Sequence, residues 1–121
     1  MTRSFTSNFL ELLNAAKASK LGMARGYLSY SHANLYLRIG PRFVGGENIS
    51  CLQIASITIP EKYQNKEIFT KLLSELMVLD DRPIYVECVL NKRFGDALIR
   101  RGFVVVRSDM GDVSRDLFLA R

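Results

Sequence analysis

The sequence predicts an α/β fold in which a mixed, twisted β-sheet is flanked by helices on both faces. Residues 49–59 carry apolar side chains at odd and even positions, as a central strand buried on both sides does. Residues 68–79 place apolar side chains three and four positions apart, which is typical of an amphipathic helix. Residues 84–90 are a second apolar strand. Strand, helix and strand in this order predict a βαβ unit with parallel strands.

The chain is predicted to begin with a helix over residues 5–20, where apolar side chains recur along one helical face. Thr6, Ser7 or Asn8 is the expected N-cap, and Gly22 is expected to end the helix.

Strand-forming residues follow over 27–39, because apolar and polar side chains alternate there. Pro41 is expected to interrupt this strand, and residues 45–48 form a turn. Strict alternation in the next strand, over 49–59, would place Ile57 and Ile59 on the face opposite Leu52 and Ile54.

The last third of the chain is predicted to hold one more helix and a hairpin. Residues 92–101 form the helix, and Gly102 ends it. Residues 103–108 and 114–120 are strands on either side of a turn at 110–113. Because a hairpin is antiparallel, it makes the predicted sheet mixed.

Length and composition limit the class of protein. The 121 residues form a single domain, 1–121, and no apolar run approaches the ~20 residues that a membrane span needs. The N-terminus has no signal-peptide pattern, so we predict a cytoplasmic protein. Two distant cysteines and one histidine give no disulfide framework and no metal-ligand spacing.

The net charge of +5 favours an anionic partner. The basic residues are scattered, which argues against a nucleic-acid interface. A more specific signal is the polar loop before the helix at 68–79, because unpaired N–H groups at a helix start bind phosphate. Lys62, Lys66 and Lys71 could add charge there, although an ordinary connection with solvated lysines remains the alternative. Arg93, Arg100 and Arg101 lie on a separate helix and have no assigned role.

Two segments resemble the GNAT superfamily of N-acetyltransferases. They are LQIASITIPEKYQNKEIFTKLLSEL and VECVLNKRFGDALIRRGF, which match the family's strand, phosphate-binding loop and helix, and its next strand and helix. The spacing from Asn91 to Gly102 and Phe103 also matches. The resemblance covers residues 52–106. The particular residues of the loop and of the strand end before the second helix resemble those of small GNAT-like proteins of bacteriophages. It implies a GNAT-like fold, truncated at the N-terminus because the usual first strand is missing.

The resemblance further implies that acetyl-CoA is the cofactor. Ile57, Thr58 and Ile59 would face its pantetheine arm, and Asn91 would lie near the thiol end. The pyrophosphate would be cradled by backbone N–H groups of the loop and helix start, which are those of Gln64, Asn65, Lys66, Glu67, Ile68 and Phe69. The sequence departs from the family where Glu67 and Phe69 replace two loop glycines and Leu98 replaces the tyrosine that protonates the leaving thiolate.

If the chain is catalytic, an amine attacks the bound thioester directly, and Glu87 is the candidate base. Burial in an apolar strand disfavours the charged form of a carboxylate, which makes it a stronger proton acceptor. The alternative is that Glu87 forms a structural ion pair with an arginine. Tyr30, Tyr36 and Tyr85 are candidate proton donors, each with a core or rim role as the alternative.

Three functions from different classes therefore remain open, the third of which is a basic module that binds nucleic acid. The first is an acyltransferase that uses acetyl-CoA to modify an amine, for which a protein is one acceptor. The second is a non-catalytic GNAT-like binding protein that acts on a host protein, if the chain is phage-encoded. Edge strands such as the final hairpin offer a route to a homodimer.

Overall fold

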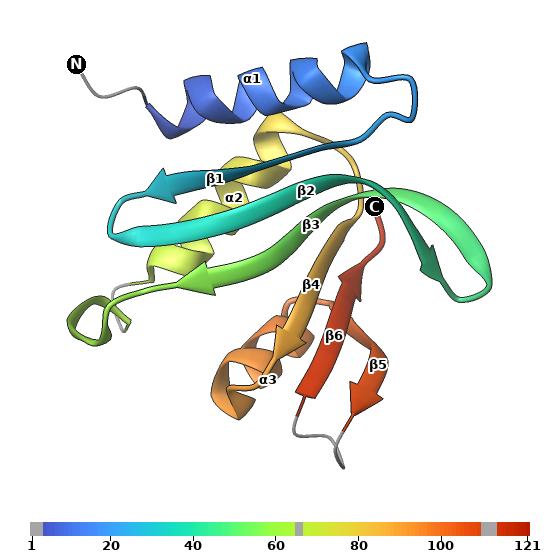
Figure 1. Cartoon of the computed structure of the whole chain (residues 1–121). Helices are drawn as coiled ribbons and strands as arrows, with labels where there is room; N and C mark the ends of the chain where they lie inside the picture. Colours follow the sequence, from blue (N-terminus) through green and yellow to red (C-terminus); the bar gives the residue numbers. More distant parts are fainter. Residues whose placement is uncertain (1–3, 65–66, 110–113) are drawn as a thin grey trace.

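The computed structural model describes residues 4–64, 67–109 and 114–121 (Figure 1). The described residues form one six-stranded mixed sheet and three α-helices. The elements in chain order are α1 (Phe5–Ala18), β1 (Ala24–Tyr30), β2 (Ala33–Val44), β3 (Glu47–Thr58), a 3₁₀ turn (Glu61–Tyr63), α2 (Ile68–Leu79), β4 (Ile84–Val89), α3 (Lys92–Arg100), β5 (Val104–Asp109) and β6 (Ser114–Leu119). The strand order is β1-β2-β3-β4-β6-β5. This confirms the predicted α/β fold class, a mixed β-sheet flanked by helices.

The first helix begins one turn earlier than its predicted caps would place it. Ser4 is the N-cap, and its side chain accepts a hydrogen bond from the Ser7 N–H at 3.1 Å. The prediction of Thr6, Ser7 or Asn8 as the cap was therefore wrong. Thr6 instead donates to the Glu75 carboxylate on α2 at 2.7 Å, which ties the two helices together.

Strands β1, β2 and β3 form an antiparallel meander. The turn between β2 and β3 is only Gly45 and Gly46, both with positive φ, as the tightest hairpins require. Pro41 does not interrupt β2, contrary to prediction. The first residue of β1, Ala24, pairs with Ile39, so β1 does not reach Pro41. At Pro41, β2 pairs only with β3 and needs one hydrogen-bonding edge, not two.

Strands β3 and β4 are parallel and pair over only three residues each, from Leu52–Ile84 to Ile54–Val86. Beyond these pairs the two strands diverge, with β3 leading to the 3₁₀ turn and β4 to α3 (Figure 1). On its other side β4 pairs with β6, which pairs in turn with β5 as the predicted final hairpin. The predicted turn at 110–113 lies outside the described residues.

A β-bulge in β3 changes which face its last residues occupy. The register with β2 shifts between Tyr36 and Leu37, so Ile57 pairs with Leu35 and Ile54 pairs with Leu37. Ile57 therefore shares a face with Ile54, and the prediction from strict alternation was wrong, because one extra residue reverses the alternation.

All three helices pack on the same face of the sheet, so the prediction of helices on both faces was wrong. Apolar residues of α1, α2 and α3 join one buried cluster with strand residues of that face, including Leu37, Ile54, Val86 and Leu117. The helices also touch one another: Phe69 of α2 packs edge-on against Phe94 of α3, with ring centroids 4.6 Å apart. We call the side of the sheet on which the three helices pack the helix-covered face.

The other side of the sheet, which we call the open face, carries no helix of the described residues. Its side chains include those of Tyr36, Arg38, Gln53, Tyr85 and Asp116, which alternate with the apolar residues of the helix-covered face. A small second cluster lies here, made of Val44, Cys51, Tyr85 and Phe118 with Ile49 against it. The sheet thus has one apolar face and one largely polar face.

Candidate functional site

A groove lies on the helix-covered face, next to the point where β3 and β4 diverge. Its volume is about 570 Å³, and it lies between the end of β3, the start of α2 and one side of α3. The lining residues are Ile57, Ile59, Gln64, Phe69, Asn91, Arg93, Phe94, Asp96, Ala97 and Arg100. The lining combines apolar, amide and charged side chains, so it suits an amphiphilic ligand.

The fold brings together five of the residues for which the GNAT resemblance predicts a cofactor contact: Ile57, Ile59, Gln64, Phe69 and Asn91 all line the groove. The other assigned residues differ in placement. Thr58, Glu67 and Ile68 are not among the lining residues, and Ile68 is a buried residue at the start of α2. Asn65 and Lys66 lie outside the described residues. Their assignment to phosphate binding stays a prediction.

Asn91 has a structural task as well as a place in the groove wall. It is the N-cap of α3, and its Oδ1 accepts a hydrogen bond from the Phe94 N–H at 3.1 Å. Asparagine is among the preferred N-cap residues because it satisfies one of the unpaired N–H groups of the first turn. Asn91 therefore fixes where α3 begins, and so positions the helix that forms one wall of the groove.

Glu67 adopts the backbone conformation that its glycine counterpart in the GNAT pattern favours. Its φ is 57° and its ψ is 25°, in the left-handed region, where the backbone of any residue other than glycine is strained. The exposed Glu67 side chain makes no capping hydrogen bond to α2. The residue before α2 thus has a left-handed backbone without being a glycine.

Side chains of α3 form a groove wall that the sequence analysis missed. Arg93, Asp96, Ala97 and Arg100 follow the helical spacing of i, i+3, i+4 and i+7, and all four line the groove. That spacing was readable in the sequence. The sequence did not indicate that the side of α3 with these four residues faces the end of β3 and the start of α2.

Asp96 is paired inside this wall. Arg115 of β6 contacts the Asp96 carboxylate at 3.4 Å and donates to the Lys92 carbonyl at 3.3 Å. Gly95 makes room for this arginine, because a Cβ at that position would lie 2.2 Å from Arg115 Nη2. The negative charge of Asp96 is therefore opposed by Arg115.

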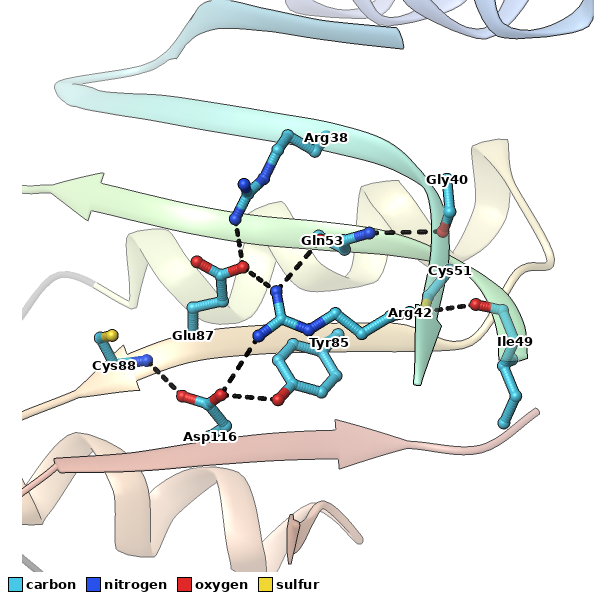
Figure 2. Close-up of polar contacts among 10 residues, drawn as sticks. All are labelled: Arg38, Gly40, Arg42, Ile49, Cys51, Gln53, Tyr85, Glu87, Cys88 and Asp116. Carbon is cyan, nitrogen blue, oxygen red and sulfur yellow. Dashed lines mark hydrogen bonds and ion pairs between the residues drawn. The ribbon is translucent and has the colours of Figure 1, made fainter. Parts of the chain in front are cut away.

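Glu87, the candidate base, lies on the open face and contacts two arginines (Figure 2). Arg38 Nη2 and Arg42 Nη1 both donate to its Oε1. Among the described residues, none donates a hydrogen bond to Oε2, and the side chain is 14% exposed. The ion pair weighed as the alternative role of Glu87 is thus present, while one carboxylate oxygen is left for another partner.

Asp116 is the second acidic centre of the open face. It is 6% exposed and accepts hydrogen bonds from the Tyr85 hydroxyl at 2.6 Å and from the Cys88 N–H at 2.8 Å (Figure 2). Arg42 Nη2 lies 3.4 Å from the same carboxylate, and the Arg42 guanidinium stands 4.2 Å above the Tyr85 ring. Arg42 therefore links Glu87 to Asp116.

Cys88 shows why Asp116 is needed. The β4 register shifts between Val86 and Val89, and Cys88 has a φ of 52° within this bulge. Its N–H is removed from the strand ladder, and the Asp116 carboxylate satisfies it. The bulge consists of Glu87 and Cys88, which lie opposite Asp116, and Glu87 is the first residue of β4 beyond the last β3–β4 pair.

The candidate proton donors have other partners. Burial and the hydrogen bond to Asp116 raise the pKa of Tyr85 to about 12, which makes it a poor acid near neutral pH. Burial and the Glu75 carboxylate raise the pKa of Tyr30. Tyr36 packs edge-on against Tyr27, with centroids 4.6 Å apart. Leu98, at the position of the family's tyrosine, is 1% exposed in the core and is absent from the groove lining.

Of the lysines expected near the groove, Lys62 and Lys71 do not line it, and Lys66 lies outside the described residues. Lys62 stands over the Tyr63 ring at 5.1 Å, and Lys71 is exposed on α2. Tyr63 also stacks on His32, with ring centroids 3.6 Å apart. His32 thus connects the β1–β2 turn to the 3₁₀ turn that precedes α2.

No group of three or more histidine, cysteine, aspartate and glutamate side chains within 4–64, 67–109 and 114–121 could hold a metal ion. In those same ranges, no helix has both the length and the apolar character required to cross a membrane.

Comparison with known proteins gives a likeness in structure only. No protein-family model matches the sequence, and no curated protein matches it. Among solved structures, a chain in the crystal structure of the KacTA–DNA complex is similar, with a TM-score of 0.48 and 18% sequence identity. The similarity covers 93% of this chain and 76% of that chain.

Proposed function

We propose that the chain is a GNAT-like acyltransferase that takes acetyl-CoA in the groove beside α3 and modifies an amine. The observation that supports this most is the composition of the groove. Ile57, Ile59, Gln64, Phe69 and Asn91, which the sequence pattern assigns to the cofactor, lie on one surface where two parallel strands separate. In open α/β sheets, ligands bind outside the carboxyl ends of such strands.

The chemistry of the groove fits the proposed cofactor. Apolar side chains on β3 and α2 suit an extended aliphatic arm, and the amides of Gln64 and Asn91 can hydrogen-bond to amide groups along it. Acetyl-CoA, when bound, supplies an acetyl group activated as a thioester. The chain's own contribution is to hold that group near the point where β3 and β4 diverge.

The acceptor amine would approach from the open face. Glu87 is the first residue of β4 past the last pair with β3, and it faces away from the helices. Its Oε2 can accept a proton from an incoming ammonium, directly or through water, while Arg38 and Arg42 fix Oε1. The freed amine can then attack the acyl carbon, so that the C–N bond forms and the C–S bond breaks. CoA leaves as the thiolate, which takes up, through solvent, the proton that the acylated nitrogen loses. A protein acceptor suits this face because no helix of the described residues covers it.

A second function is favoured by two specific observations. Leu98 cannot donate a proton to a leaving thiolate and lies in the core, and the Glu87 carboxylate is held by two guanidinium groups. Both features suit a binding protein that has kept the fold without the reaction. In that case the open face, with its charged side chains, is the surface for a protein partner.

Calorimetry with acetyl-CoA, followed by an acetylation assay on lysine-containing peptides, separates the two functions. An acyltransferase binds acetyl-CoA and releases CoA in the presence of peptide. Glu87→Gln should lower turnover at least about tenfold without weakening acetyl-CoA binding, whereas the exposed control Glu61→Gln should change neither. Binding without turnover for any amine favours the binding protein. Absence of binding at millimolar acetyl-CoA contradicts the acyltransferase.

A further inference from the structure

Two arginines in the groove wall have no side-chain partner among the described residues. Arg93 and Arg100 lie seven residues apart on α3, which is about 10 Å along a helix axis, and both line the groove. Within the described ranges, neither forms a hydrogen bond or an ion pair with another side chain. They therefore present two free guanidinium groups to whatever occupies the groove.

Neighbouring arginines behave differently. Arg101 donates to the Thr70 hydroxyl at 2.7 Å, Arg115 pairs with Asp96, and Arg121 donates to the carbonyls of two α2-terminal residues at 2.6 and 3.0 Å. These three arginines hold the C-terminal half of the fold together. Arg93 and Arg100 have no such structural task, so their charges are available to a ligand.

The charge balance of the groove favours an anion. Asp96 is the one acidic residue among the described lining residues, and Arg115 opposes its charge from outside the groove. The facing wall is apolar, with Ile57, Ile59 and Phe69. A ligand that matches both walls has an apolar arm and at least one phosphate group, since guanidinium groups bind phosphate through paired hydrogen bonds.

The described residues around the start of α2 are a poorer place for that phosphate. Glu67 carries a carboxylate at the start of α2, and Lys62 and Lys71 do not line the groove. We propose that Arg93 and Arg100 hold the phosphate groups of the ligand, so that α3 takes over a task that a glycine-rich loop would otherwise perform. This inference rests on the proposed function, because it names the contacts that the phosphates of acetyl-CoA would make.

Calorimetry with CoA, 3′-dephospho-CoA and pantetheine tests the assignment. The variants are Arg93→Gln, Arg100→Gln and the double variant, with Arg25→Gln as a control. Arg25 is an exposed arginine of β1 on the open face, so its loss changes the net charge equally and leaves the groove intact. Thermal unfolding of each variant checks that the fold is kept.

We expect each groove substitution to weaken CoA binding about 10- to 100-fold, as loss of a hydrogen bond to a charged group does. Arg25→Gln should bind CoA as the wild type does. Pantetheine, which has no phosphate, should bind wild type and double variant equally. Salt should weaken CoA binding to the wild type far more than to the double variant.

Two results overturn the proposal, and they differ in what else they affect. If the folded double variant binds CoA as tightly as the wild type, α3 does not hold the phosphates, while the proposed function stands. If the wild type fails to bind CoA at millimolar concentration, both the assignment and the proposed function fail.

Discussion

The two faces of the sheet are stabilised in different ways. On the helix-covered face, three helices bury one continuous apolar cluster, which runs from Phe9 of α1 to Leu117 of β6. On the open face, a chain of charged and polar groups runs from Arg38 through Glu87 and Arg42 to Asp116 (Figure 2). Apolar packing is additive and non-directional, whereas a polar network depends on every member being satisfied.

The difference also divides the proposed work of the protein. The groove with its two free arginines is on the helix-covered side, and the carboxylate that can take a proton is on the open side. The two meet where β3 and β4 stop pairing, after Ile54 and Val86. A sheet interrupted at that point gives a donor bound on one face access to an acceptor on the other.

The largest effect is expected from the apolar side of the comparison. Phe9 is fully buried between α1 and the sheet, so Phe9→Ala should lower the free energy of unfolding by about 3–5 kcal/mol. Leu10, its neighbour on the same helix, is 44% exposed, and Leu10→Ala should cost much less. Urea unfolding at low and high salt measures both. A strong salt dependence of the Phe9→Ala effect would contradict a purely apolar origin.

The next largest effect tests the polar side. Asp116→Asn keeps the shape and one acceptor but leaves Arg42 with only Glu87 as a charged partner. We expect a loss of about 3 kcal/mol in unfolding free energy, typical of removing one partner of a buried pair. The exposed Asp81→Asn is the matched control. If Asp116→Asn costs no more than Asp81→Asn, the network does not stabilise the open face.

Tyr85 makes the same network sensitive to alkaline pH. Its pKa is raised from 10.0 to about 12, so between these values the unfolded chain has lost a proton that the folded chain keeps. Stability is therefore fully present below pH 10 and falls as the pH rises toward 12, by at most about 1.4 kcal/mol per pH unit.

Tyr85→Phe should remove this contribution to the pH dependence, although it also removes the hydrogen bond to Asp116 at every pH. The measurement is urea unfolding of both proteins from pH 8 to 12. The difference in stability between them should shrink above pH 10. A difference that stays constant across this range would show that Tyr85 titrates normally in the folded protein.

The smallest effect concerns the entrance to the groove. Glu67→Gly should raise the unfolding free energy by about 0.5–1 kcal/mol, because glycine adopts a φ of 57° without strain, which outweighs its greater freedom when unfolded. Lys71→Gly, inside α2, should instead destabilise by about 1 kcal/mol. If both substitutions destabilise equally, Glu67 is not strained in solution.

Much of the fold was predictable because its signals are local. Helix α2 begins and ends where the apolar spacing of residues 68–79 placed it, and Gly102 ends α3 with a φ of 101°. Errors occurred where a distant partner decided the outcome. Pro41 stays in β2 because the pairing of β2 with β1 stops at Ile39. Ile57 lies on the other face than predicted because β3 has a bulge opposite Tyr36 and Leu37.

The candidate site was predictable in part. The sequence pattern pointed to five of the groove's lining residues through the strand, loop and helix around residues 57–69 and through Asn91. It left Arg93 and Arg100 without a role, because nothing in the sequence says toward which element a helix turns its basic side. It also left Glu87 with two roles, because the arginines that contact it are more than 40 residues away in the chain.

The sequence by itself determined the order of helices and strands, the parallel β3–α2–β4 unit and the mixed character of the sheet, since these follow from side-chain periodicity and turn residues. Tertiary structure alone decided that all helices share one face, that Arg42 joins Glu87 to Asp116, and that α3 lends two arginines to the groove. The physical reason is the separation along the chain. Side-chain periodicity reflects residues a few positions apart, whereas the ion pairs and the groove involve distant residues that only folding brings together.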